Sequence, residues 1–122
     1  MKSILFAIAL LVFAGCAKPA RPQAEVDRSL KALATALESW KANEPPAKLK
    51  APPEPIEFNE DLRRAFVLES FAVGGVMDID PKYVQVKATL KLKDKKGKTE
   101  ERDVVYQIEL GSPIRVLHDP YY

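Results

Sequence analysis

The chain has 122 residues, with 19 Lys and Arg against 17 Asp and Glu, one His and one Cys. This length predicts one domain, and a formal net charge of +2 argues against a dedicated nucleic-acid-binding protein, which is usually strongly basic. A single Cys excludes an internal disulfide, and together with a single His it leaves too few ligands for a zinc site. We therefore expect no nucleic-acid partner, no metal and no cofactor.

The first fifteen residues have the pattern of a secretion signal. Lys2 supplies a positive charge, and residues 4–13 are an unbroken apolar run. Such a run reaches only ~15 Å as a helix, about half of a bilayer core, so it is too short to span a membrane. A basic start, a short apolar run and small residues after it predict a signal peptide over residues 1–15.

Phe13-Ala14-Gly15-Cys16 resembles the bacterial lipobox, in which the cysteine is acylated with fatty acids such as palmitate and the chain is cut before it. The resemblance implies that Cys16 is the lipidation site and the membrane anchor. Ala17, in place of the Asp that marks inner-membrane retention, implies the periplasmic face of the outer membrane. Several acyl chains would hold a small domain firmly, because each buried CH₂ contributes ~0.8 kcal/mol. The alternative is an ordinary signal peptide with a cysteine near its cleavage site.

An amphipathic helix is the most strongly patterned element of the remaining chain. Large apolar side chains recur at steps of four and three residues, which places them on one helix face. They are Val26, Leu30, Leu33, Leu37 and Trp40. Asn43 can adopt the left-handed conformation that closes a helix, and Pro45-Pro46 cannot continue one, so the helix is predicted to end near Ala42.

The segments before and after this helix are predicted to be linkers. Residues 16–24 contain two prolines and no large apolar side chain, which predicts an extended tether. Residues 44–55 hold five of the ten prolines, which predicts a stiff crossover. A domain boundary there is an alternative, but a lone helix and an uncovered sheet would each lack stability. We therefore expect a single domain over residues 25–122.

Beyond the crossover the apolar period becomes two, and residues 83–93 are predicted to form a strand with one buried face. Asp94 and Gly97 predict a hairpin with a three-residue loop at 95–97. On the wet face this register sets Lys91 opposite Glu101, whereas a two-residue loop would mix apolar and charged faces. On the buried face it pairs Ala88 with Val104, Val86 with Tyr106 and Val84 with Ile108.

Shorter strands are predicted at 56–58, 65–73 and 114–118, with an irregular connection at 74–81. The segment 65–73 could instead form a poorly patterned helix. In the strand reading, Phe66, Leu68, Ser70 and Ala72 share one face. The predicted fold class is α+β, with one N-terminal helix packed on an antiparallel meander of three or four strands.

This order of elements resembles the cystatin-like and nuclear-transport-factor-like architectures, in which a curved sheet cradles a helix. Residues 25–118 also resemble uncharacterised small domains of planctomycete proteins, through residues 37–41, 94–98, 105–106 and 114–116. Those domains carry no assigned activity, so the resemblance implies none. Cystatin-type protease inhibition would require a Gln-x-Val-x-Gly loop, and residues 85–89 have the wrong residues for it.

No catalytic, cofactor-binding or metal-binding residues are predicted. His118 has no second His, no Cys partner and no Ser-His-Asp spacing, which argues against catalysis or ligation. Asp78 and Asp80 could offer oxygens to calcium, but a turn ended by Pro81 explains them better. Trp40 is interpreted as a core residue rather than a ligand platform.

A cluster of lysines marks the hairpin tip, and we interpret it as a solvated surface rather than an anion-binding one. It comprises Lys91, Lys93, Lys95, Lys96 and Lys98. The chain is thus predicted to be a lipid-anchored, non-enzymatic envelope protein that contacts the membrane through Cys16 and an unknown envelope partner. The alternative is a small-molecule-binding or catalytic domain with a cavity between helix and sheet. The predicted inner face offers only the Tyr106 hydroxyl for that purpose.

Overall fold

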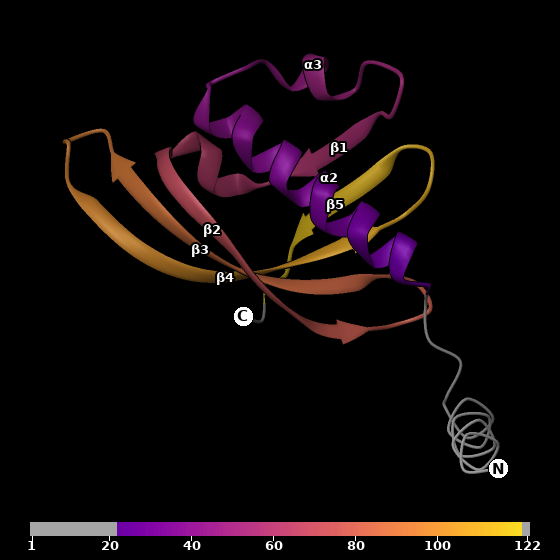
Figure 1. The fold of residues 1–122 in the computed structure, drawn as a ribbon. Helices are drawn as coiled ribbons and strands as arrows, with labels where there is room; N and C mark the ends of the chain where they lie inside the picture. The colour runs from indigo at the N-terminus through magenta and orange to yellow at the C-terminus, as the bar shows by residue number, and fades with distance from the viewer. Residues whose placement is uncertain (1–21, 121–122) are drawn as a thin grey trace, which may run out of the picture.

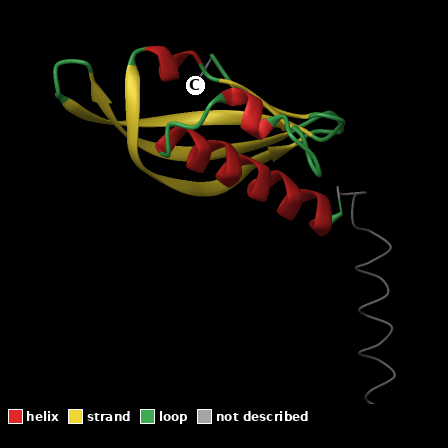
Figure 2. Cartoon of the chain, turned by 90° about the horizontal axis from the view of Figure 1, so that it is seen from above, coloured by secondary structure: helices red, strands yellow, loops and turns green. Residues whose placement is uncertain are grey.

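The structure is a computed structural model that describes residues 22–120 (Figure 1). The predicted signal peptide, Cys16 and most of the predicted tether lie outside the described residues. The described chain is an α+β domain of two layers, in which one long helix lies across one face of a five-stranded sheet (Figure 1 and Figure 2). The predicted fold class is confirmed at this level. In chain order the elements are α2 (Gln23–Lys41), α3 (Pro46–Leu49), β1 (Ile56–Asn59), the 3₁₀ helix η1 (Asp61–Arg64), β2 (Phe66–Ile79), β3 (Val84–Asp94), β4 (Thr99–Glu109) and β5 (Ile114–His118).

Helix α2 buries the apolar stripe that the sequence predicts. Leu33 and Leu37 are fully buried, and the indole N–H of Trp40 donates a hydrogen bond of 3.3 Å to the Phe66 carbonyl at the start of β2. Asn43 has a φ of 55°, as expected for the residue that closes the helix. The helix begins at Gln23, so the last two residues of the predicted tether are helical.

The proline-rich crossover contains one element that the sequence analysis missed, the short helix α3. Pro46 occupies the first position of this helix, where a proline loses no intrahelical hydrogen bond. Leu49 is buried at its end and joins the core beneath the crossover. Proline spacing predicts stiffness here, but it does not distinguish an extended segment from a single helical turn.

The β3–β4 hairpin has the predicted loop and register. Ala88 pairs with Val104, and Lys91 lies opposite Glu101. Gly97 has a φ of 86°, a conformation that a side chain would strain. The Asp94 carboxylate accepts hydrogen bonds of 2.9 Å from two backbone N–H groups of the loop, which fixes the turn.

Strand β2 is confirmed as a strand, but it differs from the prediction in length and in facing. It continues to Ile79 through the segment predicted to be an irregular connection. A register shift between Leu68 and Ser70 inserts one extra residue, which reverses the facing of the residues that follow. Phe71 and Val73 therefore pack against the core, whereas the prediction placed Ser70 and Ala72 on the same face as Leu68.

The sheet is mixed, with the order β1-β5-β4-β3-β2, because β1 lies parallel to β5 while the other neighbours are antiparallel. The predicted antiparallel meander of three or four strands is therefore wrong in strand number and in topology. Strand β1 does not pair with β2, the next strand along the chain, because η1 carries the chain to the opposite edge of the sheet. As a consequence, the carboxyl ends of β1 and β5 lie side by side.

Candidate functional site

The carboxyl ends of β1 and β5 bring together three polar side chains from distant parts of the sequence. Asn59, the last residue of β1, pairs with Leu117, and Glu60 follows immediately. His118 ends β5, and its partner across the antiparallel pair on β4 is Tyr106. Strand pairing alone therefore places Glu60, His118 and Tyr106 at one corner of the sheet.

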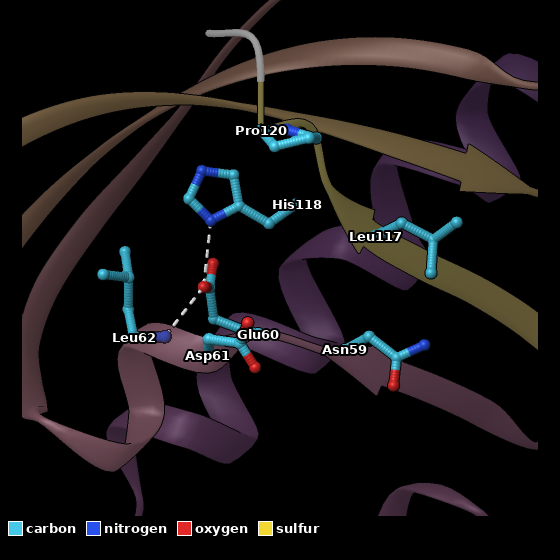
Figure 3. A pocket seen from close by; sticks show the side chains of 7 residues that line it. All are labelled: Asn59, Glu60, Asp61, Leu62, Leu117, His118 and Pro120. Carbon is cyan, nitrogen blue, oxygen red and sulfur yellow. Dashed lines mark hydrogen bonds and ion pairs between the residues drawn. The ribbon is translucent and has the colours of Figure 1, made fainter.

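The Glu60 carboxylate is the centre of this cluster and has no exposed surface. One of its oxygens accepts a hydrogen bond of 2.5 Å from the Tyr106 hydroxyl. The other oxygen lies 2.9 Å from Nδ1 of His118 and accepts a hydrogen bond of 3.0 Å from the Leu62 backbone N–H (Figure 3). A buried carboxylate is costly unless it is hydrogen-bonded, and these three contacts supply that compensation.

Tyr106 is fully buried and holds one side of the cluster in place. Its ring packs between Phe58 and His118, with ring-centroid distances of 6.0 and 5.5 Å. Burial raises the pKa of the Tyr106 hydroxyl well above its ordinary value, and the nearby Glu60 charge and the hydrogen bond to Glu60 raise this pKa further. The phenol therefore keeps its proton at physiological pH and acts as the donor to Glu60.

His118 is the exposed member of the cluster, with 23% of its side chain accessible. A carboxylate can only accept hydrogen bonds, so the contact with Glu60 places a proton on Nδ1. In a neutral imidazole this leaves Nε2 as an acceptor. Figure 3 shows this second nitrogen on the side of the ring away from Glu60. Within residues 22–120 no hydrogen bond engages Nε2.

A pocket of about 440 Å³ opens beside the cluster, and we call it the Glu60–His118 pocket. It lies past the ends of β1 and β5, and not between helix and sheet as the sequence analysis expected of a cavity. No Lys or Arg is among its lining residues in the described part of the chain. These lining residues are Asn59, Glu60, Asp61, Leu62, Leu117, His118 and Pro120 (Figure 3).

The predicted inner face of the sheet is confirmed as core, and Glu60 and His118, which lie outside the residues predicted for that face, join the Tyr106 hydroxyl at one end of it. Its residues are Val84, Val86, Ala88, Leu90, Val104, Tyr106 and Ile108, all buried. Residues at every second position of β5 are buried, beginning with Ile114 and Val116. Extending this alternation to His118 would have placed it on the same face as Tyr106. No sequence signal places Glu60, because its position depends on the parallel pairing of β1 with β5.

The other residues weighed in the sequence have local, structural roles. Asp78 lies in β2, where it accepts a hydrogen bond from the Ile79 N–H, so the predicted turn does not include it. Asp80 accepts a hydrogen bond from the Lys82 N–H in the connection between β2 and β3. Trp40 is confirmed as a core residue. Over residues 22–120 no three His, Cys, Asp or Glu side chains are grouped closely enough to hold a metal ion. Cys16, the predicted lipidation site, lies outside the described residues.

Comparisons of the chain with protein families, with curated proteins and with solved structures found no match. The resemblances to the lipobox and to the planctomycete domains therefore stay predictions.

Proposed function

We propose that the protein is a lipid-anchored protein of the bacterial cell envelope whose folded domain is a non-enzymatic binding module. The lipid anchor is inferred from the position of the only cysteine, Cys16, which directly follows an apolar run and two small residues. The absence of Asp at position 17 supports the periplasmic face of the outer membrane. In the part of the chain that the structure describes, no helix is long and apolar enough to cross a membrane.

The anchor is tested by expressing the full chain with Cys16→Ser in a Gram-negative host. We expect wild-type protein to incorporate labelled palmitate, to begin at Cys16 by mass spectrometry and to fractionate with the outer membrane. The Cys16→Ser chain should do none of these. Phe13→Leu is the matched control, because it alters the same motif but keeps the cysteine, and it should remain lipidated. A wild-type N-terminus elsewhere than Cys16 would refute the anchor.

We further propose a cystatin-like or nuclear-transport-factor-like architecture for the domain. Helix α2 lying across one face of the five-stranded sheet supports it. An experimental structure that separates α2 from the sheet would contradict this proposal.

The geometry favours a small molecule, and not an envelope protein, as the ligand of this module. The single supporting observation is the convergence of Glu60, Tyr106 and His118 beside a pocket of about 440 Å³, a size typical of small-ligand sites. No Ser, Thr or Cys is among the described lining residues, which argues against catalysis by a hydroxyl or thiol nucleophile at this pocket.

Ligand binding is tested by screening charged and neutral small molecules against the full chain in detergent micelles. The imidazole signals of His118 provide the readout, because it is the only histidine in the sequence. We expect at least one class of ligand to shift these signals in a saturable way. No saturable shift from any class would leave a protein partner as the better account of the module.

A further inference from the structure

We propose that one end of the domain rests on the lipid surface, with Met77 and Ile79 immersed in the membrane interface. This end, which we call the Met77–Ile79 end, consists of residues 77–83 and the first turn of α2. The inference rests on the proposed lipid anchor at Cys16 and adds to it the surface that the domain turns towards the membrane. Two observations carry it: where the chain from Cys16 enters the domain, and where apolar side chains are exposed.

The chain from Cys16 enters the domain at the Met77–Ile79 end. The C-terminal end of α2 is joined to the start of β2 by the hydrogen bond from Trp40 to the Phe66 carbonyl. Phe66 in turn pairs with Asp94, at the start of the β3–β4 loop. The N-terminus of α2 and the end of β2 therefore lie at the other end of the domain, opposite the hairpin tip, as both views show (Figure 1 and Figure 2).

The length of chain between Cys16 and the domain limits how far this end can lie from the membrane. Pro22 is the sixth residue after Cys16, and six residues span at most ~21 Å even when fully extended. An acylated Cys16 thus keeps the Met77–Ile79 end within that distance of the bilayer in every orientation. The hairpin tip with its lysines can lie a further ~36 Å away, because β3 has 11 residues.

Large apolar side chains are exposed at this same end. Met77 and Ile79 each have 42% of their surface exposed, and the third exposed large apolar residue of the described chain is Val67, near the opposite end of β2. Ile79 pairs with the fully buried Val84, so it extends the apolar inner face of the sheet to its rim. Transfer of apolar surface from water to lipid is favourable, and a short tether supplies the lipid surface at high effective concentration.

The charges at this end favour contact with neutral lipid. The charged residues of segment 77–83 are Asp78, Asp80 and Lys82, so acids are in excess. Asp78 pairs with Gln85 and follows the alternation of the strand, which places it on the face opposite Ile79. The excess of acid would repel anionic headgroups. The expected contact is therefore apolar and independent of salt.

The proposal is tested with the processed, lipidated protein in phosphatidylcholine nanodiscs that contain a lipid with a nitroxide on its headgroup. The methyl group of Met77 and the indole N–H of Trp40 are the NMR reporters, because Met77 is the only methionine after Cys16 and Trp40 is the only tryptophan. We expect the nitroxide to abolish the Met77 signal and to leave the Trp40 signal, since α2 places Trp40 at the far end of the domain. Raising the salt concentration should not restore the Met77 signal.

Two matched variants separate lipid contact from tethering alone. Ile79→Asp introduces a charge into the proposed contact and should restore the Met77 signal. Val67→Asp introduces the same charge at an exposed apolar position near the opposite end of β2, and the Met77 signal should stay lost. An unchanged Trp40 chemical shift shows that each variant keeps its fold, and Ile79→Ser replaces Ile79→Asp if that shift changes.

The outcomes separate this inference from the anchor on which it rests. A Met77 signal that persists in lipidated wild-type protein would overturn the lipid contact and leave the anchor intact. The same conclusion would follow from loss of the Met77 and Trp40 signals together, from recovery of the Met77 signal at high salt, or from its continued loss in the variant at Ile79. A wild-type chain that begins elsewhere than Cys16 and does not enter the nanodiscs would overturn both.

Discussion

The Glu60–His118 corner, which consists of Glu60, Tyr106 and His118, and the exposed face of the β3–β4 hairpin both bring polar and charged side chains together. The corner is buried, whereas the hairpin face is in contact with solvent. At the corner, a carboxylate without exposed surface accepts hydrogen bonds from groups that lie far apart in the sequence. On the hairpin, Thr89 donates to Asp103 at 2.8 Å and Lys91 lies opposite Glu101, all at the surface. A hydrogen-bonded carboxylate therefore contributes very differently to stability in the two regions.

The difference is one of solvation. Exposed pairs exchange contacts with water for contacts with each other and contribute only ~0.2–1 kcal/mol. Removing one partner of a buried, hydrogen-bonded charge costs ~3–5 kcal/mol, because the remaining polar groups cannot recover their water. The corner should thus respond strongly to changes that the hairpin tolerates.

The largest effect is expected from Glu60→Ala. This change leaves the Tyr106 hydroxyl buried without its acceptor and removes the side chain that accepts from the Leu62 N–H at the start of η1. We expect a loss of ~3–5 kcal/mol in the free energy of unfolding, measured by thermal unfolding followed by circular dichroism. Glu101→Ala on the hairpin is the matched control and should cost less than about 1 kcal/mol. Equal costs would show that Glu60 is not buried as described.

A smaller effect is expected from Tyr106→Phe, which removes a single hydroxyl. The Glu60 carboxylate then loses one of its three hydrogen bonds while staying buried, and we expect a cost of ~1.5–3 kcal/mol. Thr89→Val removes the corresponding hydroxyl–carboxylate hydrogen bond at the surface and should cost about 0.5 kcal/mol or less. Comparing the unfolding curves of the two variants isolates the effect of burial, and a larger cost for Thr89→Val would contradict the account.

Raising the pH tests the burial of the Tyr106 hydroxyl through the loss of a single proton. The pKa of Tyr106 is raised above its ordinary value of 10.0 mainly by burial. Its contribution to stability is therefore fully present below pH 10 and is lost as pH rises above it, because the unfolded chain releases the phenolic proton first. The free energy of unfolding should fall by up to ~1.4 kcal/mol per pH unit there, relative to Tyr106→Phe. Parallel curves for the two proteins between pH 9 and 11 would refute this.

The smallest effect is expected at the hairpin tip, from replacing Lys95, Lys96 and Lys98 by Gln. Exposed charges contribute only tenths of a kcal/mol, so the melting temperature should hardly change. If the lysines instead bound anionic lipid, the three of them would contribute ~3 kcal/mol to the free energy of membrane binding. Their replacement would then weaken binding roughly a hundredfold. Sedimentation of the lipid-free domain, residues 25–122, with and without these changes, with anionic vesicles at two salt concentrations distinguishes the two interpretations. We expect no salt-sensitive difference between the two.

The two regions also differ in how far their contacts reach along the chain, and this difference explains which of them the sequence predicts. Asp94 and Gly97 mark the turn between β3 and β4, and the alternation on both sides fixes the register, because every contact there is local. The corner depends on β1 pairing with β5, strands separated by most of the domain, and β1 has only four residues to signal it. The predicted facing of β2 is wrong for a different reason: the one-residue bulge after Leu68 changes the phase of the alternation, and a strict period of two carried across it assigns Phe71 and Val73 to the wrong face.

Of the candidate site, Tyr106 was placed correctly on the inner face because its strand alternates strictly. Glu60 lies between the predicted strands 56–58 and 65–73, in a position where acidic residues are common, and nothing in its neighbours indicates a buried carboxylate. His118 was set aside because no Cys or second His could complete a site with it. Its actual partner is an acid 58 residues away in the sequence, which only the sheet topology brings near.

The orientation of His118 by Glu60 can be read from the tautomer of the single imidazole. Long-range ¹⁵N–¹H correlation spectra of the full chain at pH 9, where imidazoles are ordinarily neutral, report which ring nitrogen carries the proton. We predict a proton on Nδ1 and an unprotonated Nε2, the reverse of the tautomer that free histidine prefers, and we predict that Glu60→Ala abolishes this preference. A proton on Nε2 in the wild-type protein would contradict the account.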